Sequence, residues 1–281
     1  MRVAAIQLTA GADRHANLAQ ALGAVRDAAA AGARLIVLPE KWLAIGDGTT
    51  LAAAAQRLDG PLVAALAGVA AELEVDLIAG TIPEAPPAGD PDRRPWNTSL
   101  HVAPGGQLRA AYRKLHLFDA EIDGRQYRES AGERRGEHPV ITTLADGTVA
   151  GLSVCFDLRF APLYATLVAG GATLLTVPAA FTLATTRAHW EPLLRARAID
   201  AGAWVIAANQ AGQHPDGTRS GGQSMIVSPW GEVAARAPES GDAVVIADLD
   251  GAAVTDARSA LPTRALVRPD AYARTPGSGL A

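Results

Sequence analysis

Short apolar runs alternate along the chain with longer stretches whose apolar residues recur at helical spacing. The runs that predict buried strands lie at residues 3–8, 34–39, 76–80, 173–177, 204–208, 224–227 and 244–247. The stretches that predict helices lie at residues 61–74, 162–169 and 188–201. Asp13 is placed to cap a further helix, in which Leu18, Leu22 and Val25 share one face. Strands that alternate with helices in both halves of the chain indicate an α/β fold.

Turn residues predict two hairpins within this pattern, at Pro104-Gly105-Gly106 and at Asp146-Gly147. The strands that flank these turns lie at residues 97–103, 107–112, 140–144 and 148–154. Hairpins join antiparallel strands, so we expect a mixed sheet rather than a purely parallel one.

The proline-rich stretch at residues 83–95 predicts a surface loop, because strand patterns resume directly after it. We therefore expect one domain over residues 1–270. The tail at residues 271–281 is expected to be loose or to dock on a partner subunit.

Charge and cysteine content narrow the classes of function. The chain has 281 residues and a formal net charge of −4, and no cluster of Lys and Arg predicts nucleic-acid binding. No apolar stretch approaches the roughly 20 residues of a membrane-spanning helix, so we expect no membrane partner. The single cysteine, Cys155, excludes an internal disulfide and is typical of a reducing compartment. We therefore expect a cytoplasmic protein that acts on a small molecule.

Three residues with chemical potential follow predicted strands: Glu40, Lys114 and Cys155. Reactive groups in α/β proteins gather beyond the carboxyl ends of strands, so these three side chains could converge. Each also has an ordinary interpretation. Glu40 and Lys114 could be solvated surface residues, and a lone cysteine among apolar neighbours is usually a small core residue.

A series of motifs, in a fixed order along nearly the whole chain, resembles the nitrilase superfamily of carbon–nitrogen hydrolases. The motifs are LPE (38–40), YRKLHLFD (112–119), YRES (127–130), CFDLRF (155–160), AFTLATTRAHWEPLLRARAID (180–200), SMIVSPWGEV (224–233) and LPTRALVRPDAY (261–272). The later motifs resemble the amidase branch, which includes deaminated-glutathione amidases and ω-amidases. The resemblance implies a four-layer α-β-β-α sandwich of two mixed sheets. It also implies a homodimer or a higher homo-oligomer, and it calls for no cofactor or metal.

The same resemblance implies a role for each matched residue. Cys155 would be the nucleophile, Glu40 the general base, Lys114 the cationic partner, and Glu129 a further active-site carboxylate that holds Lys114. The backbone N–H of Phe156 would stabilise the oxyanion together with Lys114. A free thiol with a pKa of about 8.5 is mostly protonated at neutral pH, so it needs such a base or cation to become reactive.

Four residues are candidates for substrate binding. Arg159 either pairs with Asp157 or another carboxylate, or binds a substrate carboxylate as a guanidinium fork. Phe181, Thr182 and Trp190 could wall the pocket, although Trp190 could equally be a core residue. If Arg159 binds substrate, the substrate is a small carboxylated amide, such as deaminated glutathione or the ω-amide of a 2-oxo acid.

Two departures from the branch pattern bear on this pocket. Relatives usually carry Thr-Gly where this chain has Thr185-Thr186, and Tyr-Gly-His-Ser where it has Gly221-Gly222-Gln223-Ser224. A threonine in place of glycine is expected to change the loop backbone and to narrow the pocket.

Other functions remain open at this point. True nitrilases usually follow the cysteine with Trp-Glu, whereas Phe156-Asp157 favours amide cleavage. An N-carbamoyl-amide hydrolase is a second alternative within enzymes. A glutaminase domain is disfavoured, because no phosphate-binding glycine-rich loop marks a synthetase partner. The alternative outside enzymes is a catalytically silent scaffold, which does not require all four reactive residues to be kept.

Overall fold

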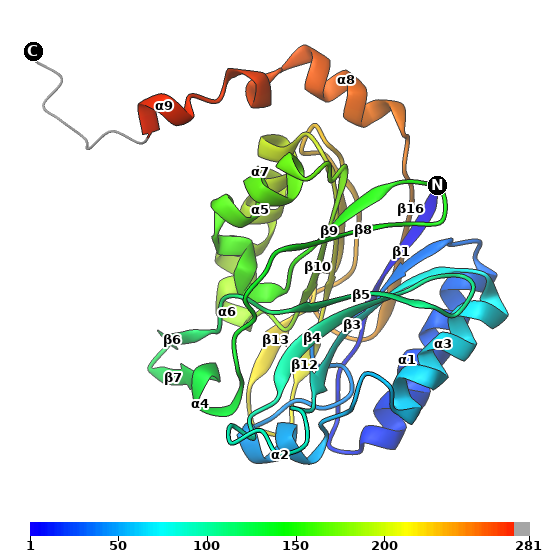
Figure 1. The fold of residues 1–281 in the computed structure, drawn as a ribbon, viewed down its shortest axis with the longest axis vertical. Coiled ribbons are helices and arrows are strands. Elements are labelled where there is room, and N and C mark those ends of the chain that lie inside the picture. The colour runs from blue at the N-terminus through cyan, green and yellow to red at the C-terminus, as the bar shows by residue number, and fades with distance from the viewer. Residues whose placement is uncertain (273–281) are drawn as a thin grey trace, which may run out of the picture.

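The computed structural model describes residues 1–272, whose main strands form two six-stranded mixed sheets packed face to face (Figure 1). The strands of the first sheet are β1 (Arg2–Gln7), β2 (Leu35–Val37), β3 (Asp76–Glu84), β4 (Trp96–Val102), β5 (Leu108–Arg113) and β16 (Ala243–Asp248). Those of the second are β8 (Val140–Thr143), β9 (Val149–Leu152), β10 (Leu174–Ala179), β11 (Trp204–Asn209), β14 (Met225–Val227) and β15 (Val233–Arg236). The predicted strands and both predicted hairpins are therefore present.

The two sheets repeat one pattern of strand pairing. The first has the order β16-β1-β2-β3-β4-β5, and the second has the order β8-β9-β10-β11-β14-β15. In each sheet the second, third and fourth strands are parallel, and the outer pairings are antiparallel. β2 and β10 are thus equivalent, each as the third strand of its sheet, and the chain segments that follow them lie at the centre of the molecule.

Helices cover the outer face of each sheet. α1 (Arg14–Ala30) and α3 (Pro61–Leu73) pack on the first sheet, and α5 (Ala161–Ala169) and α7 (Glu191–Ala201) pack on the second (Figure 1). The Asp13 side chain accepts hydrogen bonds from the backbone N–H groups of His15 and Ala16 and so caps α1, as predicted. The layers follow the order α-β-β-α, which confirms the expected fold.

The buried apolar residues form two clusters: one lies between the sheets and continues beneath α5 and α7, and the other lies beneath α1 and α3. In β1, Val3 and Ala5 belong to the cluster between the sheets, whereas Ala4 and Ile6 belong to the cluster beneath α1 and α3. Alternate residues of a strand point to opposite faces, so a strand buried on both sides is apolar throughout. This explains the continuous apolar runs in the sequence.

The predicted helix at residues 188–201 differs from the structure at its start. Residues Thr186–Trp190 form a π-helical turn, and the regular helix α7 begins only at Glu191. Helical backbone nevertheless continues from the π-helical turn into α7, and Pro192 lies directly after the junction. Proline has no N–H for the hydrogen bond of a regular α-helix, and such an interruption of the regular bonding is accommodated by the π-helical turn.

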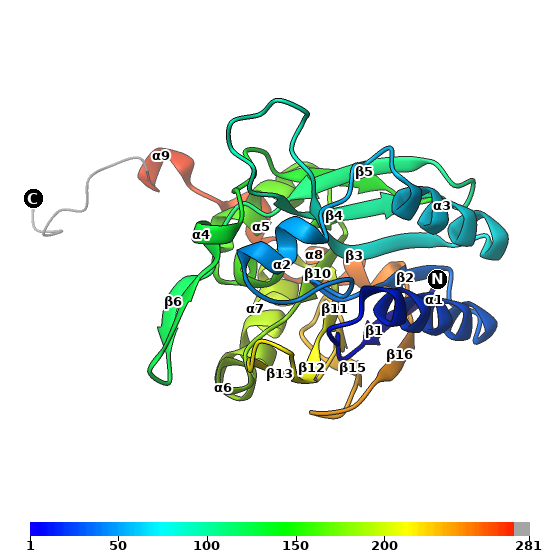
Figure 2. The same ribbon diagram turned by 90° about the horizontal axis from the view of Figure 1, so that it is seen from below.

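The shorter elements were not predicted from sequence periodicity. They are the hairpin strands β6 (Asp119–Ile122) and β7 (Arg125–Arg128), which project from the body in Figure 2, the strands β12 (Ala211–Gln213) and β13 (Arg219–Gly221), and the helices α2 (Gly48–Ala53), α4 (Glu129–Gly132), α6 (Leu183–Thr185), α8 (Ala252–Ala260) and α9 (Pro269–Tyr272). Residues 263–266 form a 3-10 turn between α8 and α9. Most of the expected tail, at residues 273–281, lies outside the described residues.

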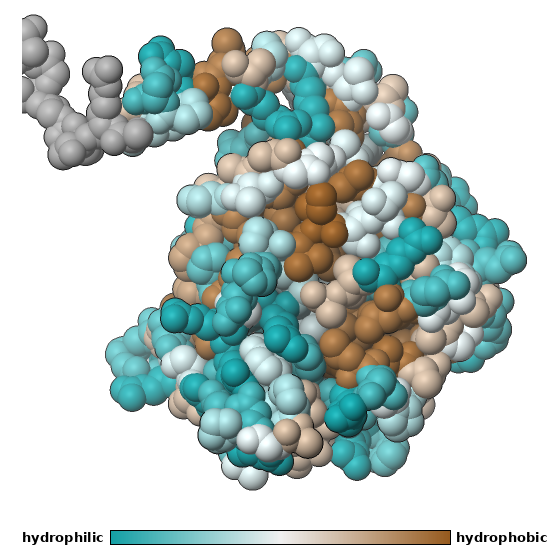
Figure 3. All heavy atoms as spheres, in the orientation of Figure 1, coloured by the Kyte–Doolittle hydropathy of each residue, from teal (hydrophilic) through white to brown (hydrophobic). Residues whose placement is uncertain are grey.

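None of the helices within residues 1–272 has both the length and the apolar character needed to cross a bilayer. The face shown in Figure 3 carries apolar patches between hydrophilic groups.

Candidate active site

The carboxyl ends of strands from both sheets bring the predicted reactive residues together. Glu40 follows β2, Lys114 follows β5 directly, and Cys155 follows β9. All three are buried. The Lys114 ammonium donates to Glu40 Oε1 at 2.9 Å. Both groups act on the pKa of the Cys155 thiol, which Glu40 raises and Lys114 lowers. Lys114 and Cys155 therefore share one site with Glu40, although they follow it by 74 and 115 positions along the chain.

Glu40 is held by donors on both of its carboxylate oxygens. Besides Lys114, the side-chain amide of Asn97 donates to Oε1 at 2.8 Å. The backbone N–H of Ala180, which follows β10 in the second sheet, donates to Oε2 at 2.8 Å. Three donors on one carboxylate fix its position.

Lys114 is an ammonium ion rather than a base in this arrangement. Its Nζ donates to Glu129 at 2.8 and 3.0 Å as well as to Glu40. Burial alone would lower the pKa of Lys114, but the Glu129 and Glu40 carboxylates outweigh burial and raise that pKa well above its ordinary value. Lys114 therefore supplies a fixed positive charge beside the sulfur.

Glu129 was predicted as the fourth member, and the structure places it on the far side of Lys114 from Glu40. The backbone N–H of Phe118 donates to its Oε2 at 2.6 Å. Burial alone would raise the pKa of Glu129, but the ammonium groups of Lys114 and Lys41 more than offset burial and hold the pKa well below its ordinary value. Glu129 is therefore ionised and locks Lys114 in place.

Cys155 opens a 3-10 turn, Cys155–Arg159, in a left-handed backbone conformation with φ of 49°. Non-glycine residues rarely adopt this conformation, and it is enriched at functional sites. Burial, and secondly the negative charge of Glu40, raise the pKa of the Cys155 thiol well above its ordinary value, although Lys114 opposes them. The resting sulfur is therefore a protonated thiol, which needs Glu40 to accept its proton.

The buried carboxylate of Asp157 fixes the turn that carries Cys155. Asp157 accepts from the Tyr112 hydroxyl at 2.7 Å and from the Val154 N–H at 2.9 Å. It also contacts the His116 ring nitrogen Nδ1 at 2.7 Å. With these partners, Asp157 does not form the ion pair with Arg159 that the sequence left open. The next residue towards the cysteine, Phe156, has a backbone N–H with no acceptor among the described residues.

Arg159 lies beside the site without a carboxylate partner among residues 1–272. Its guanidinium lies 5.1 Å from the centre of the Phe181 ring and contacts His189 Nδ1 at 3.3 Å. Burial lowers the pKa of Arg159, and the Cys155 sulfur opposes this effect. A half-buried cation of this kind is suited to an incoming anion.

The other predicted wall residues occupy different depths. Phe181 and Thr182 follow β10 and are almost fully buried. Trp190 has no exposed surface, and its ring packs 4.9 Å from that of Phe181. The Trp190 indole N–H donates to the carbonyl of Gln223 at 2.8 Å. Trp190 therefore supports Phe181 from behind and presents no surface of its own.

Three participating residues were missed at the level of sequence: Asn97, Lys41 and Glu133. Asn97 is the second residue of β4, and its side-chain amide donates to both Glu40 and Glu129. Lys41 lies 3.0 Å from Glu129 and 2.6 Å from Glu133. The only sequence signals are that Lys41 adjoins Glu40 and that Glu133 follows Glu129 by four residues. No group of three or more metal-ligating side chains is found in the described part of the chain.

The two departures from the branch pattern fit each other in space. Thr186 has ordinary helical angles, φ −62° and ψ −50°, so the expected change of loop backbone is not required. Its buried hydroxyl donates to the Phe181 carbonyl at 3.1 Å, from behind the loop. A Cβ added at Gly221 would lie only 2.3 Å from Thr186 Cβ. Thr186 thus fills the space that a side chain at position 221 would need.

We expect Gly221→Ala to destabilise the fold by about 1–3 kcal/mol, because the added methyl overlaps Thr186. The double variant Thr186→Gly/Gly221→Ala should lose less than the sum of the two single losses, by about 1 kcal/mol or more. Urea unfolding of the wild type, both single variants and the double variant measures this. Additive losses would show that the two positions are independent.

Comparisons with known proteins agree with the fold and with the order of the motifs. The model of the carbon–nitrogen hydrolase family matches residues 2–259. The chain is 35% identical over 272 residues to the chloroplastic ω-amidase of Arabidopsis thaliana, covering 95% of this chain and 72% of that protein. It is 36% identical over 263 residues to the deaminated glutathione amidase of a Synechocystis strain, covering 92% of this chain and 95% of that protein.

A solved structure supports the same assignment. The crystal structure of the Caenorhabditis elegans NitFhit protein aligns with a TM-score of 0.88 at 35% identity, over 96% of this chain and 66% of that chain. The match of sequence, fold and motif order establishes that the chain belongs to the carbon–nitrogen hydrolase family.

Proposed function

We propose that the protein is an amidase in which Cys155 is the nucleophile and Glu40 the general base. The observation that carries the proposal is a buried thiol beside a carboxylate that is held by three donors. Burial raises the pKa of this thiol, so attack on a carbonyl is expected to need proton transfer to Glu40 as the C–S bond forms. The names of the two relatives, both amidases, support the same reaction.

The reaction proceeds in two halves. In the first, Cys155 Sγ attacks the amide carbonyl carbon while Glu40 takes the thiol proton. Glu40 then gives that proton to the leaving nitrogen, ammonia departs, and a thioester remains. In the second half, Glu40 takes a proton from a water molecule while the oxygen of that water attacks the thioester carbonyl carbon. The acid leaves, and the sulfur recovers the proton from Glu40.

Lys114 and the backbone N–H of Phe156, which has no acceptor within residues 1–272, are the groups proposed to stabilise the oxyanion of each tetrahedral intermediate. Lys114 is fixed as a cation next to Cys155, and the Phe156 N–H belongs to the residue directly after the nucleophile. Donors fixed in advance in a dry site stabilise charge that develops only in the transition state.

We infer that the substrate is a small amide that carries a carboxylate, because Arg159 lacks a carboxylate partner within residues 1–272 and lies against Phe181 near the sulfur. Deaminated glutathione and the ω-amides of 2-oxo acids have this chemistry. The names of the relatives favour the same two substrates.

The proposed function is tested by ammonia release from a panel of small amides, nitriles and carbamoyl compounds. We expect turnover of carboxylated amides. Acid quenching and intact-mass analysis should then detect an acyl adduct on Cys155, the only cysteine. Preferential release of ammonia from nitriles, or carbamoyl cleavage, would reassign the substrate. No adduct with any compound would favour a silent scaffold.

Replacing Arg159 by methionine is expected to raise KM for a carboxylated amide by about 10–100-fold, the usual effect of losing a charged hydrogen-bonded contact. The same variant should hydrolyse the matching amide without a carboxylate at nearly the wild-type rate. Initial-rate kinetics on the substrate pair measures both effects. Equal losses on the two substrates would mean that Arg159 does not bind the carboxylate.

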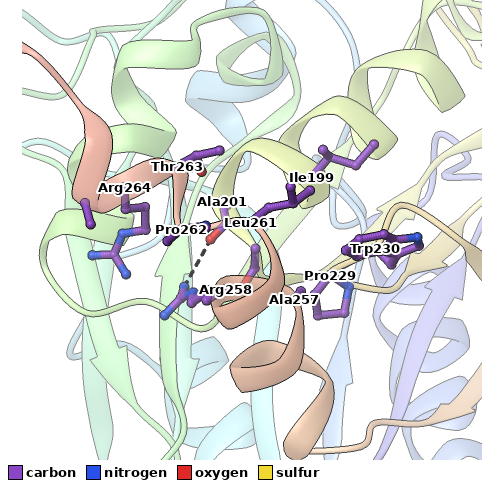
Figure 4. Close-up of a pocket in the computed structure, with 12 residues that line it drawn as sticks. Ile199, Ala201, Pro229, Trp230, Ala257, Arg258, Leu261, Pro262, Thr263 and Arg264 are labelled. Carbon is purple, nitrogen blue, oxygen red and sulfur yellow. Dashed lines mark hydrogen bonds between the residues drawn. The ribbon is translucent and has the colours of Figure 1, made fainter.

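We also propose that the chain forms a homodimer or a higher homo-oligomer. A cavity of about 340 Å³ beside α7 and α8 is lined by apolar groups that include Ile199, Trp230 and Leu261 (Figure 4). These side chains are 48–56% exposed. The segment beyond α8 arches away from the body with apolar atoms in the open (Figures 1 and 3). A second copy of this chain would cover both surfaces.

Trp230→Glu is expected to convert the oligomer to a monomer, because a buried carboxylate in an apolar interface is strongly unfavourable. Light scattering after size exclusion measures the mass. Ile141→Glu, at a 41% exposed apolar residue on β8, is the matched control and should leave the mass unchanged. A wild-type monomer would refute the assembly.

A reducing compartment such as the cytoplasm is the proposed location, since the sulfur must stay reduced to react.

A further inference from the structure

Five buried or nearly buried side chains, acidic and basic in alternation, form a chain of contacts that begins at Glu40. Glu40 contacts Lys114 at 2.9 Å, and Lys114 contacts Glu129 at 2.8 Å. Glu129 contacts Lys41 at 3.0 Å, and Lys41 contacts Glu133 at 2.6 Å. The side chains of Lys114 and Glu133 are each only 1% exposed, and even Lys41 is only 14% exposed. The first three members belong to the proposed catalytic site, and the last two extend it.

A local turn of the backbone brings the Lys41 side chain to Glu129. Lys41 directly follows Glu40 but has a left-handed φ of 55°. Its backbone N–H donates to Thr81 Oγ1 at 2.9 Å, which fixes the turn. The two neighbouring side chains therefore diverge, and each meets a different end of the Lys114–Glu129 pair.

Glu133 reaches Lys41 from the other end of the short helix α4. Its backbone N–H donates to the Glu129 carbonyl at 2.9 Å, which sets the two glutamates one helical turn apart. Burial raises the pKa of Glu133 to about 8, with the negative charge of Glu129 adding to burial and Lys41 opposing it. Glutamine is therefore a close substitute for Glu133 near neutral pH.

Charge balance gives Lys41 a specific task. Glu40 and Glu129 are two buried carboxylates that share one ammonium, that of Lys114. One cation cannot fully balance two buried anions. Lys41 supplies the second cation, and it contacts Glu129 Oε1 at 3.0 Å, an oxygen that also accepts from Lys114. Without it, Glu129 would draw more strongly on Lys114, and the site around the sulfur would be more negative.

We propose that Lys41 and Glu133 are positioning residues for the reaction: Lys41 holds Glu129 ionised and aimed at Lys114, and Glu133 orients Lys41. The proposal rests on the proposed function of Cys155, Glu40 and Lys114. It assigns a role to two residues that touch neither the sulfur nor the oxyanion.

The test compares two double variants that each remove a basic side chain and the acidic side chain in contact with it. Lys41→Met/Glu133→Gln removes the proposed positioning pair. Arg113→Met/Glu84→Gln is the matched control, because Arg113 directly precedes Lys114 and pairs with the buried Glu84 at 2.6 Å. The control removes both partners of its pair, and the first double leaves Glu129 in contact with Lys114, so both are expected to fold. Urea unfolding verifies this before any kinetics.

We expect kcat of Lys41→Met/Glu133→Gln to fall by about 10–100-fold with KM nearly unchanged, the usual cost of removing the outer partners of a reactive group. The control double should keep kcat within about threefold, and Lys41→Arg, which retains the charge, should recover most of the lost rate. A kcat equal to that of the control double would overturn the proposal, because the pair would then serve stability alone.

A second readout separates this proposal from the proposed function. Iodoacetamide can modify only Cys155, since the chain has one cysteine. At pH 7.5 we expect the alkylation rate of Lys41→Met/Glu133→Gln to be several-fold below that of the control double, because the lost positive charge disfavours the thiolate. If the wild type hydrolyses no amide, the proposed function fails, and alkylation still decides the role of the pair. Equal alkylation of the two doubles would then overturn it.

Discussion

Glu40→Gln is expected to lower amide turnover by about 10²–10⁴-fold, the range that general acid–base catalysis supplies. Glutamine is close to glutamate in shape, and its carbonyl can still accept a hydrogen bond from Lys114 or from Ala180. It cannot accept the thiol proton, and burial keeps that thiol protonated. The variant should therefore bind the substrate but form the thioester very slowly.

The same variant should make the sulfur more acidic while making the enzyme slower. The negative charge of Glu40 is one of the causes that raise the pKa of Cys155, so its removal should lower that pKa. The pH dependence of alkylation measures the change. Glu84→Gln, the same substitution at a buried carboxylate paired with Arg113, is the control and should leave turnover within about threefold. Turnover by Glu40→Gln within tenfold of the wild type would rule out Glu40 as the base.

Lys114→Met is expected to destabilise the protein by about 3–5 kcal/mol, because it leaves the buried carboxylates of Glu40 and Glu129 without their shared cation. Turnover should fall by at least about 10²-fold through loss of an oxyanion donor. Urea unfolding and initial rates measure the two losses. Lys114→Arg keeps the charge but not the compact geometry, so it should recover stability better than activity.

The stability loss of Lys114→Met should depend on pH with a defined sign. Glu129 has a folded-state pKa well below its ordinary 4.5, so its contribution is present above about pH 4.5 and is lost as the pH falls further. Lys114 has a folded-state pKa well above its ordinary 10.5, so its contribution is present below about pH 10.5. The difference from the wild type should therefore be largest between about pH 5 and pH 10. A difference that grows as the pH falls below 4.5 would contradict this account.

The sequence predicts the strands and the reactive residues at their ends for the same reason. Strands buried on both faces must be apolar, so a glutamate or lysine directly after such a run stands out, as Glu40 and Lys114 do. Cys155 is less distinct, because a cysteine is compatible with a core strand. The structure ends that strand at Leu152, and the Asp157 carboxylate folds the following residues into the turn that carries the sulfur.

The residues that escaped prediction depend on contacts that no local pattern records. Lys41 looks like an ordinary loop lysine, and only its left-handed backbone and the approach of Glu129 make it a buried ion. Glu133 and Asn97 likewise take part in the site only through contacts with residues at least 32 positions away. Glu133 contacts Lys41, and Asn97 contacts Glu129. Thr186 and Gly221 were each noticed as departures, but their mutual fit became visible only when the chain was folded.

The reacting pair is divided between the two layers of strands: Glu40 extends from one sheet, whereas Cys155 extends from the other and Ala180, a donor to Glu40, lies beside it. The distance over which the proton travels is therefore set by the thickness of the packing between the sheets. Changes of side-chain volume there, at Val3 or Val177 for example, would move donor and acceptor relative to each other. Mutations far from the sulfur can in this way alter the rate of the chemical step without touching a reactive group.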